Sequence, residues 1–455
     1  MKILLVNPHL PADPSTFLLH PPLGHGYLAS RLRRAGHDVA HVDLPLTGND
    51  PSVLVGVLDG FAADVVGVTS VAQSYAAALQ VAAVAKQVRP DCWVVLGGPH
   101  VSFLPRECLR RHGCVDFVVT FDAETSFVDL CTALAAHVPT GHLTEVDGLA
   151  FRADDTTIVV TPAASPTRNL DALGHPDRTI FDMGAYLRRD YETVVMGARG
   201  CPGRCAFCSS NLAGRTYRWH SARHIADEVA QVLDLGFTSV FFGDDTFAGN
   251  SRRLDDFCNE IARRGIDVPW TCNIRAQDAR PQLLDRMRAA GAYRVFVGFE
   301  SIQADTLRLM RKGSSPGQMA EQASLIRRAG LELHASFIVG APGDTHESLR
   351  ETLDFVRVLD PTIATFNTME PRPGTDVHAN PGRYGICVPD PFWYETTAWL
   401  DGPVCSTQHL TAHEIKDWVA RCYTAFCDPG TARPQQHPDG TSVGAETPTR
   451  SGAGR

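Results

Sequence analysis

The stretch Cys201-Pro-Gly-Arg-Cys205-Ala-Phe-Cys208 places three cysteines on one short segment, with three and then two residues between them. The apolar run Val194-Val195-Met196 and then Gly197 precede it, which predicts a strand that runs into a glycine-rich loop. A four-iron cluster normally takes four cysteine thiolates, so three on one loop would leave one iron open to another ligand. Zinc more often uses paired C-x2-C half-sites or histidines, and a zinc-bound or structural role is the alternative.

With the segments around it, this loop resembles the radical S-adenosylmethionine (radical SAM) enzymes over about residues 192–374. In that family the open iron chelates the amino and carboxylate groups of SAM, and the reduced cluster cleaves SAM to methionine and a 5′-deoxyadenosyl radical. The resemblance implies that Cys201, Cys205 and Cys208 bind a 4Fe-4S cluster. It also implies that Phe207, the residue before the last cysteine, lies near the adenine of SAM.

The composition is that of an ordinary globular protein of two or three domains, with 455 residues, 44% apolar residues and 20% charged residues. A formal net charge of −9 argues against a general nucleic-acid or anionic-membrane binder. We find neither a signal peptide nor a membrane-spanning apolar run. The thirteen cysteines are scattered along the chain, and we expect them to be reduced thiols in the cytoplasm without disulfides.

Residues 1–138 alternate between strand and helix patterns, which predicts a doubly wound parallel sheet of Rossmann-like type. Such sheets bind ligands at the carboxyl ends of their strands. The loops expected there are Asn7-Pro8-His9, Thr69-Ser70 and Gly97-Gly98-Pro99-His100. The first strand is not followed by G-x-G-x-x-G, so a dinucleotide site is the weaker interpretation.

The segment Pro21–Leu28, taken with Gly97–His100, resembles the cobalamin-binding domain that precedes many radical SAM domains. Glycines at these positions would let the backbone approach a flat corrin ring closely. The resemblance implies cobalamin contacts from these two segments and from the Thr69-Ser70 loop. The residues are Leu23, Gly24, Ser70, Gly97, Gly98, Pro99 and His100.

Two features depart from the usual cobalamin-binding pattern. The D-x-H-x-x-G motif that supplies a cobalt ligand is absent, and the expected glycine-rich turn reads Thr120-Phe121-Asp122-Ala123-Glu124, whose bulk could crowd the nucleotide tail. The histidines His9, His25 and His100 are possible cobalt ligands, but each is more simply a loop residue that makes hydrogen bonds.

Residues 139–190 read as a hairpin and a Pro-rich linker, and residues 191–380 resume the alternation with six strand–helix units. Six such units predict a partial (β/α)6 barrel, in which working residues sit at the carboxyl ends of the strands. The expected strands are 193–197, 239–242, 270–273, 294–298, 334–339 and 364–368.

The ends of these strands carry the side chains that the radical SAM resemblance assigns to SAM. Asp244 and Asp245 would accept hydrogen bonds from the amino group, and Arg275, with Asn273 beside it, would pair with the carboxylate. Glu300 would hold the ribose hydroxyls, and the Val339 stretch would contact the adenine. Each residue alone also fits a cap, a structural salt bridge or a simple turn.

Residues 381–427 form a short C-terminal capping segment, and residues 428–455, rich in Gly, Pro, Thr and Ser, are predicted to be a disordered tail. The aromatic cluster Phe392, Trp393, Tyr394 and Trp399 would either pack as core or line a substrate pocket.

These resemblances together imply a cobalamin-dependent radical SAM enzyme, similar to the class B radical SAM methyltransferases. The expected cofactors are a 4Fe-4S cluster, SAM and cobalamin, and the expected reaction is methyl transfer to an unactivated carbon of a small molecule. An electron donor such as flavodoxin or ferredoxin would reduce the cluster. The alternatives are a rearrangement, ring contraction or cyclisation without methyl transfer, a methylthiotransferase, and a non-catalytic metal-bound scaffold.

Overall fold

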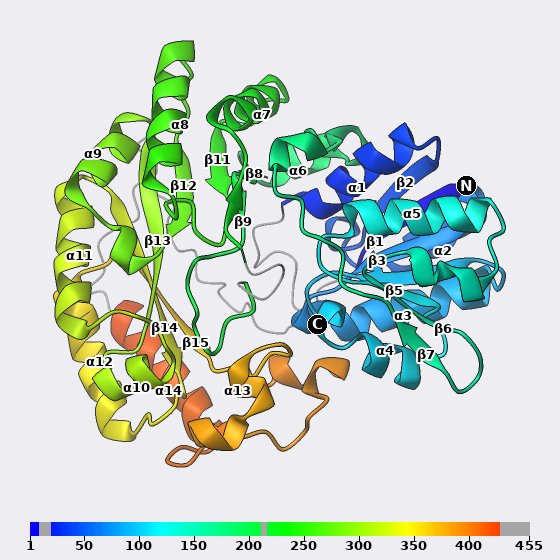
Figure 1. Cartoon of the computed structure of the whole chain (residues 1–455). Helices are drawn as coiled ribbons and strands as arrows, with labels where there is room; N and C mark the ends of the chain where they lie inside the picture. Colours follow the sequence, from blue (N-terminus) through cyan, green and yellow to red (C-terminus); the bar gives the residue numbers. More distant parts are fainter. Residues whose placement is uncertain (9–19, 211–215, 428–455) are drawn as a thin grey trace, which may run out of the picture.

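The computed structural model describes residues 1–8, 20–210 and 216–427, and it contains two large, mainly parallel sheets that lie side by side (Figure 1). His9 and the predicted tail 428–455 therefore lie outside the described residues. Helices separate the parallel strands of both sheets along the chain, which confirms the predicted α/β fold class.

The first sheet has seven strands in the order β2-β1-β3-β4-β5-β6-β7, and β1 to β5 are parallel, as predicted for a doubly wound domain. Successive residues of β1 supply the two faces of the sheet. Leu4 and Val6 belong to the core beneath α2, α3 and α4, whereas Ile3 and Leu5 belong to the core beneath α1 and α5. The strands are β1 (Lys2–Asn7), β2 (Asp38–Asp43), β3 (Val65–Thr69), β4 (Trp93–Gly97) and β5 (Phe117–Val119). The helices are α1 (Leu23–Arg34), α2 (Pro51–Phe61), α3 (Tyr75–Val88), α4 (Pro105–Arg111) and α5 (Ala123–Ala135).

The hairpin predicted in the connector forms as β6 (Leu149–Arg152) and β7 (Ile158–Val160). Strand β6 pairs antiparallel with β5, so the hairpin extends the edge of the first sheet. The linker that follows is packed rather than free, because Leu170 and Leu173 are buried against Leu23 and Tyr27 of α1. Helix α6 (Met183–Arg189) then leads into the second sheet.

The second sheet has six parallel strands in the order β15-β14-β13-β12-β11-β8. Strands β8 and β15 are its two edges, so the barrel is open, as the partial (β/α)6 prediction required. The strands are β8 (Glu192–Val195), β11 (Ser239–Phe242), β12 (Trp270–Ile274), β13 (Ala292–Glu300), β14 (Glu332–Val339) and β15 (Ile363–Thr368). The helices are α7 (Ala222–Asp234), α8 (Ser251–Arg264), α9 (Pro281–Ala289), α10 (Ala304–Leu309), α11 (Pro316–Arg328) and α12 (His346–Leu359).

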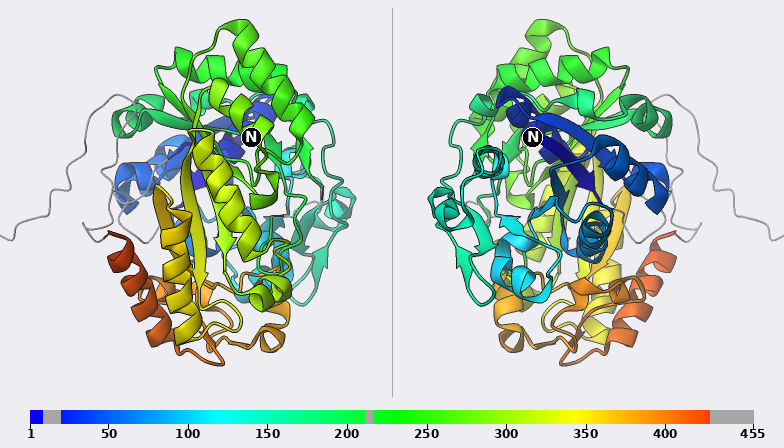
Figure 2. Two further views of the ribbon diagram at one scale, coloured as in Figure 1. Left: turned by 90° about the vertical axis from the view of Figure 1, so that its left-hand side faces the viewer. Right: turned by 90° about the vertical axis from the view of Figure 1, so that its right-hand side faces the viewer.

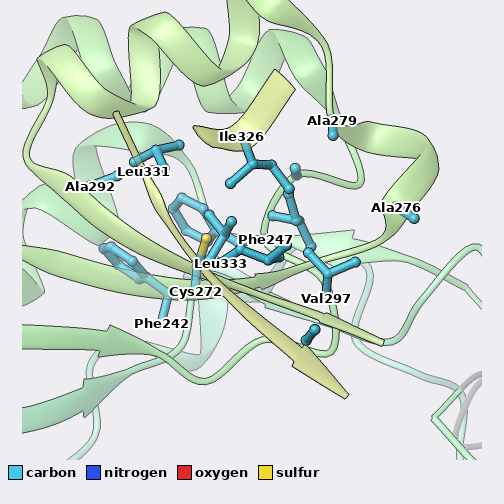
Figure 3. Packing of buried hydrophobic residues seen from close by; sticks show 14 of the residues in the cluster. Phe242, Phe247, Cys272, Ala276, Ala279, Ala292, Val297, Ile326, Leu331 and Leu333 are labelled. Atoms are coloured by element: carbon cyan, nitrogen blue, oxygen red, sulfur yellow. The ribbon is translucent and has the colours of Figure 1, made fainter. Parts of the chain in front are cut away.

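The core of the second domain lies between this sheet and the helices outside it (Figure 3). Alternate strand residues such as Phe242, Cys272 and Leu333 point into it, and Ile326 of α11 meets them. Because the outward-facing residues of each strand fill this core, the inward-facing residues and the strand ends are left to line the barrel interior.

The C-terminal segment bridges the two domains and runs beneath both of them in all three views (Figures 1 and 2). Trp393 and Tyr394 are buried in the α2–α4 core of the first domain, whereas Ile415 and Trp418 are buried in the barrel core. The aromatic cluster therefore packs as core. The elements of this segment are α13 (Asp376–Ala379), β16 (Ile386–Cys387), β17 (Ser406–Thr407) and α14 (Ala412–Cys427). Across the described residues, we find no helix with the length and apolar character needed to cross a membrane.

Candidate active site

The three cysteines lie on the loop that joins β9 (Ala198–Arg199) to β10 (Arg218–Trp219), a short antiparallel pair at the mouth of the barrel. The Ala206 N–H donates to the Met310 carbonyl at 2.9 Å, and the Ala206 carbonyl accepts from the Val377 N–H at 3.1 Å. These bonds hold the middle of the loop against the barrel. All three cysteines are half-buried, and none of the cysteines that the structure describes forms a disulfide.

Two thiols of this loop, Cys201 and Cys205, lie close together and have raised pKa values. An ideal Cβ on Gly203 would lie 3.3 Å from the Cys201 sulfur and 3.9 Å from the Cys205 sulfur. Burial raises the pKa of Cys201, and it raises the pKa of Cys205 to about 11, with the neighbouring thiols adding to the effect. A bound metal centre would replace the thiol protons and stabilise the thiolates, so the donor set fits a cluster held at three corners.

A cavity of about 460 Å³ opens beside the cysteine loop at the carboxyl ends of the barrel strands. It is lined by Cys201, Cys205 and Cys208, and by most of the side chains predicted to bind SAM. Those predicted residues are Phe207, Asp245, Asn273, Arg275 and Glu300. The structure therefore brings the predicted cluster ligands and these SAM contacts to one space.

Glu300 has an unusual backbone conformation at this cavity. Its φ is +71°, and the pairing of β13 with β14 shifts register between Gly298 and Glu300. Such a bulge re-aims a side chain at a cost in backbone energy, and it is common beside active sites. Lys312 donates to the Glu300 carboxylate at 2.9 Å, and burial of both side chains shields the pair from solvent.

Lys312 is a functional candidate that the sequence reasoning missed. Burial opposes its charge most strongly, but the Glu300 carboxylate together with Cys205 and Cys208 outweighs burial, and the pKa of Lys312 is raised. Its charge also favours ionisation of the nearby Cys205 thiol. The only sequence signal was its place in the turn Arg311-Lys312-Gly313 after a short helix, which is not distinctive.

Arg275 and Asn273 line the cavity but already have partners. Arg275 makes a bidentate pair with the Asp278 carboxylate at 2.8 and 2.6 Å, which is the structural salt bridge named as its alternative role. The Asn273 side-chain amide donates to the Asp244 carbonyl at 2.9 Å. A SAM carboxylate would therefore share the Arg275 guanidinium with Asp278.

Asp244 and Val339 are not among the residues that line this cavity, and the SAM contacts predicted for them stay predictions. The Asp244 carboxylate is fully buried, accepts from the Gly197 N–H at 2.6 Å and lies 3.5 Å from Arg253. Burial raises its pKa to about 7. Val339 is buried in the barrel core, because alternate residues of β14 face that side. Sequence order could not tell which of the adjacent acids, Asp244 or Asp245, faces the cavity.

A second cavity, of about 650 Å³, opens at the carboxyl ends of the first sheet. Of the residues predicted to bind cobalamin, Leu23, Gly24, Gly97, Gly98 and Pro99 line it. Its inner part is apolar, with Leu5, Gly67, Val95, Val119 and Phe127. The residues Phe121 to Glu124 also line it, so their bulk narrows one side of the cavity without closing it.

Two glycines of this cavity have different roles. Gly98 has φ +96°, and an ideal Cβ there would lie 2.5 Å from the Ser70 carbonyl, so only glycine fits against the end of β3. An ideal Cβ on Gly24 would meet no atom of the described residues within 4 Å, which leaves open space beside α1 for a ligand. His25 also lines the cavity, and burial lowers its pKa to about 4, so its imidazole is neutral there.

Ser70 and His100 lie behind the loop instead of lining the cavity. The Ser70 hydroxyl donates to the Gly97 carbonyl at 3.0 Å, and the His100 N–H donates to the Ser70 carbonyl at 3.2 Å. The His100 ring packs between Tyr75 and Tyr394, with both ring centroids 4.4 Å away. These two residues therefore shape the loop, and the cobalamin contacts predicted for them stay predictions.

The two cavities meet at Asp245 and Ser210, which line both of them. The Asp245 carboxylate accepts from the Gly200 N–H at 3.1 Å, one residue before the first cysteine. A molecule at this junction would lie between the cysteine loop and the glycine loop of the first sheet.

Comparison with known proteins identifies both halves of this arrangement. Residues 195–356 match the Radical SAM superfamily, and residues 15–131 match the B12 binding domain. The chain is 31% identical over 434 residues to "Uncharacterized methyltransferase PH0819" of Pyrococcus horikoshii, covering 94% of this chain and 92% of that protein. It is 28% identical to the anaerobic magnesium-protoporphyrin IX monomethyl ester cyclase of Rubrivivax gelatinosus, covering 83% of this chain and 69% of that protein.

Among solved structures, the fold matches the radical SAM methyltransferase TsrM from Kitasatospora setae, determined with cobalamin and a [4Fe-4S] cluster bound. The TM-score is 0.76 at 19% identity, with 94% of this chain and 89% of that chain covered. The cofactors of the family are a 4Fe-4S cluster, SAM and cobalamin, as predicted. From its cysteine loop, its glycine loop and its full-length similarity to these proteins, the chain belongs to the cobalamin-dependent radical SAM enzymes.

Proposed function

We propose that this enzyme transfers a methyl group from SAM to an unactivated carbon of a small molecule. The observation that carries the proposal is the junction at Asp245 and Ser210, where the cavity beside the cluster loop opens onto the cavity of the B12-binding domain. A substrate held at this junction is within reach of both cofactors. A curated relative that is 31% identical over 94% of this chain is named a methyltransferase.

When bound, the cluster supplies the electron that cleaves SAM, and the corrin carries the methyl group that the substrate receives. The residues of the chain hold and orient the reactants. Arg275 and Glu300 both line the SAM cavity and carry opposite charges, which suit the carboxylate and the ribose hydroxyls of SAM respectively. The Lys312–Glu300 pair fixes the Glu300 carboxylate before SAM arrives.

The size and polarity of the cavities support a small, uncharged substrate. The two cavities measure about 460 and 650 Å³, within the range that small-molecule sites occupy, and the cofactors themselves fill much of this space. Arg275 and Lys312 are already paired with carboxylates, so no described basic side chain of the SAM cavity is left over for an anionic substrate.

The second candidate function is radical cyclisation or rearrangement without methyl transfer. The similarity to the magnesium-protoporphyrin IX monomethyl ester cyclase, 28% identical over 83% of this chain, favours this alternative. Product mass separates the two functions, because methylation adds one methylene to the substrate and a rearrangement adds nothing.

For its surroundings we propose a cytoplasmic enzyme that receives electrons from a flavodoxin or a ferredoxin and acts on neither nucleic acid nor membrane. The half-buried cluster loop requires a one-electron donor that can approach the mouth of the barrel, and the described cysteines are unpaired, which suits a reducing compartment.

Anaerobic reconstitution with iron, sulfide and hydroxocobalamin tests the proposal. The loaded protein should show the cluster and corrin absorption bands and, on reduction with SAM, form 5′-deoxyadenosine. With substrate present, S-adenosylhomocysteine should appear together with a product heavier by one methylene. Cys205→Ala should abolish SAM cleavage, whereas Cys108→Ala, a buried thiol of α4 far from the loop, should leave it intact.

Two outcomes would overturn this proposal in different ways. SAM cleavage without methylated product or bound corrin would remove methyl transfer and leave the radical chemistry. A purified, oxygen-free protein that holds zinc at the three cysteines would remove both.

A further inference from the structure

The cysteine loop is suspended from the β9–β10 pair, and the two cross-strand partners there are both arginines. Arg199 of β9 lies directly opposite Arg218 of β10. The connection between these strands, residues 200–217, contains all three cysteines. The position of these two arginines therefore sets where the loop begins and ends.

Both arginines pair with carboxylates at the start of α5, in the B12-binding domain. The Arg199 guanidinium lies 2.5 Å from the Glu124 carboxylate and 3.4 Å from the Asp122 carboxylate. The Arg218 Nη1 that pairs with the Asp122 carboxylate also donates to the Thr167 carbonyl at 2.9 Å. Several ion pairs therefore join the two domains at this point.

The environment of these pairs makes them stronger than ordinary surface pairs. The exposed fractions of the side chains are 19% for Arg199 and 8% for Glu124, and 5% for Arg218 and 16% for Asp122. Little solvent reaches them, so salt screens them weakly. The carboxylates also lie at the N-terminal end of a 13-residue helix, where the helix dipole favours negative charge.

All four side chains also line the cavity of the B12-binding domain, so one group of residues lies between the cysteine loop and the predicted cobalamin site. They are Asp122, Glu124, Arg199 and Arg218. The Arg199 guanidinium lies 5.1 Å from the centre of the Tyr27 ring, which lines the same cavity. One residue beyond Arg199, the Gly200 N–H donates to Asp245, at the junction with the SAM cavity. A shift of this group would move the loop relative to both cavities.

Other contacts between the domains act elsewhere. Gln73 donates to Glu370 at 2.8 Å and so contacts the loop after β15. Arg111 pairs with Glu395 at 2.7 Å and so contacts the C-terminal segment. Among the described residues, the ion pairs that tie the B12-binding domain directly to the β9–β10 pair are those of Asp122 and Glu124 with Arg199 and Arg218.

We propose that Asp122, Glu124, Arg199 and Arg218, here called the loop anchor, are positioning residues that fix the distance between the cluster and the corrin. The inference rests on the proposed function, and it deepens it: the loop anchor couples SAM cleavage at the cluster to methyl transfer at the corrin. It also gives a role to the bulky turn 120–124, which departs from the usual cobalamin-binding pattern. The carboxylates there hold the partner domain.

The test measures distance and coupling in the loaded enzyme. Pulsed electron paramagnetic resonance on the holoenzyme, with cob(II)alamin and the reduced cluster as the two spins, gives the distribution of cobalt–cluster distances. Glu124→Ala and Arg199→Ala should each broaden or shift this distribution. They should also lower the methylated product formed per 5′-deoxyadenosine by at least about tenfold, since small misplacements of reacting groups cost up to about 100-fold.

Arg33→Ala is the matched control. Arg33 pairs with Asp177 at 2.6 Å and so joins α1 to the linker, but it contacts neither the cysteine loop nor either cavity. Its distance distribution and its product ratio should equal those of the parent enzyme. Arg199→Lys, which keeps the charge at Glu124, should restore part of the coupling that Arg199→Ala loses.

Unchanged distances and unchanged coupling in both alanine variants would overturn the proposal. Loss of corrin affinity at an unchanged distance would also overturn it, since the four residues would then be cofactor contacts. Should the alanine variants not fold, Glu124→Gln and Arg199→Gln remove the same charges with less loss of volume and allow the same two measurements. A parent enzyme that cleaves SAM without methylating anything would defeat the proposed function, whereas the distance measurement would still decide on the loop anchor.

Discussion

Adjacent residues of the same type do different work at this site. Asp244 and Asp245 lie in the loop that begins at Gly243 after β11, yet one carboxylate is fully buried beside Arg253 and the other is exposed where the two cavities meet. Their partners differ accordingly: the Asp244 carboxylate accepts from the Gly197 N–H, and the Asp245 carboxylate accepts from the Gly200 N–H. The pair therefore offers a comparison within one turn of the chain.

Asp244→Asn should destabilise the protein, and Asp245→Asn should weaken SAM binding. Removing the Asp244 charge leaves the buried Arg253 without its carboxylate, which should lower the free energy of unfolding by about 3 kcal/mol. Asp245→Asn should change that free energy by less than about 0.5 kcal/mol but reduce SAM affinity roughly tenfold. Urea denaturation and anaerobic SAM titration measure the two effects. Reduced SAM affinity in Asp244→Asn at unchanged stability would contradict this assignment.

His100 should act as a packing residue and not as a cofactor ligand. Neither of its ring nitrogens has a hydrogen-bond partner among the described residues, and burial lowers its pKa from 6.5 to about 3. A folded-state pKa below the unfolded value means that stability is present above about pH 6.5 and is lost as the pH falls toward 3. His100→Phe should keep cobalamin affinity, raise the free energy of unfolding at pH 7 by about 1 kcal/mol, and reduce the loss between pH 7 and pH 5.

Urea denaturation at both pH values, together with cobalamin titration, checks the His100 prediction. A variant that loses cobalamin without losing stability would show that His100 contacts the cofactor after all.

At the scale of elements, the linker and α7 are joined by a buried ion pair. Arg178 of the linker lies 2.6 Å from Glu228 of α7, and their exposed fractions are 5% and 0%. Arg178 also donates to the Val194 carbonyl of β8 at 2.8 Å, just upstream of the cysteine loop. One guanidinium thus fixes the linker, a barrel helix and the first barrel strand.

Breaking this pair should be costly. Glu228→Ala leaves the Arg178 charge buried without its carboxylate and should lower the free energy of unfolding by about 3–5 kcal/mol. Asp305→Ala, which breaks the exposed Arg308–Asp305 pair of α10, should change it by less than about 0.5 kcal/mol. Equal effects of the two substitutions in chemical denaturation would mean that the buried pair gains nothing from its surroundings.

The strands were more predictable than the contacts between them. Buried parallel strands such as β1 and β14 are apolar runs or clean alternations, so the sequence pattern located them to within a few residues. Helix α2 was not predicted, since Gly56 and Gly60 lower its helix propensity. The parallel arrangement of the strands predicts which edge of each sheet carries the cavity. The ion-pair partner of each charged residue cannot be predicted in this way, because partners such as Arg199 and Glu124 are 75 residues apart in the chain.

At the scale of the whole molecule, the two domains should unfold as one unit. Trp393 and Tyr394 of the C-terminal segment are buried in the core of the first domain. Ile415 and Trp418 of the same segment are buried in the barrel core. No pattern in the sequence of residues 381–427 indicated which domain these aromatics enter. The insertion depends on surfaces that only the folded domains present.

Trp393→Ala should uncouple the domains. Truncating a buried tryptophan costs about 3–5 kcal/mol, and the loss falls on the contact between the C-terminal segment and the first domain. Differential scanning calorimetry should show one transition for the parent protein and two for the variant. Tyr191→Ala removes an exposed aromatic ring and should keep the single transition. A single transition in both variants would mean that other contacts suffice to join the domains.

The shared segment also sets an order of assembly during synthesis. Trp393 leaves the ribosome roughly 270 residues after β5, and at about 5–20 residues per second that is a delay of roughly 14–55 seconds. During this interval the apolar groove beside α3 of the B12-binding domain stays open, because Trp393 and Tyr394, which fill it in the folded protein, have not yet been made. Until the two aromatics arrive, this apolar groove is a surface at which chaperones bind or incomplete chains associate.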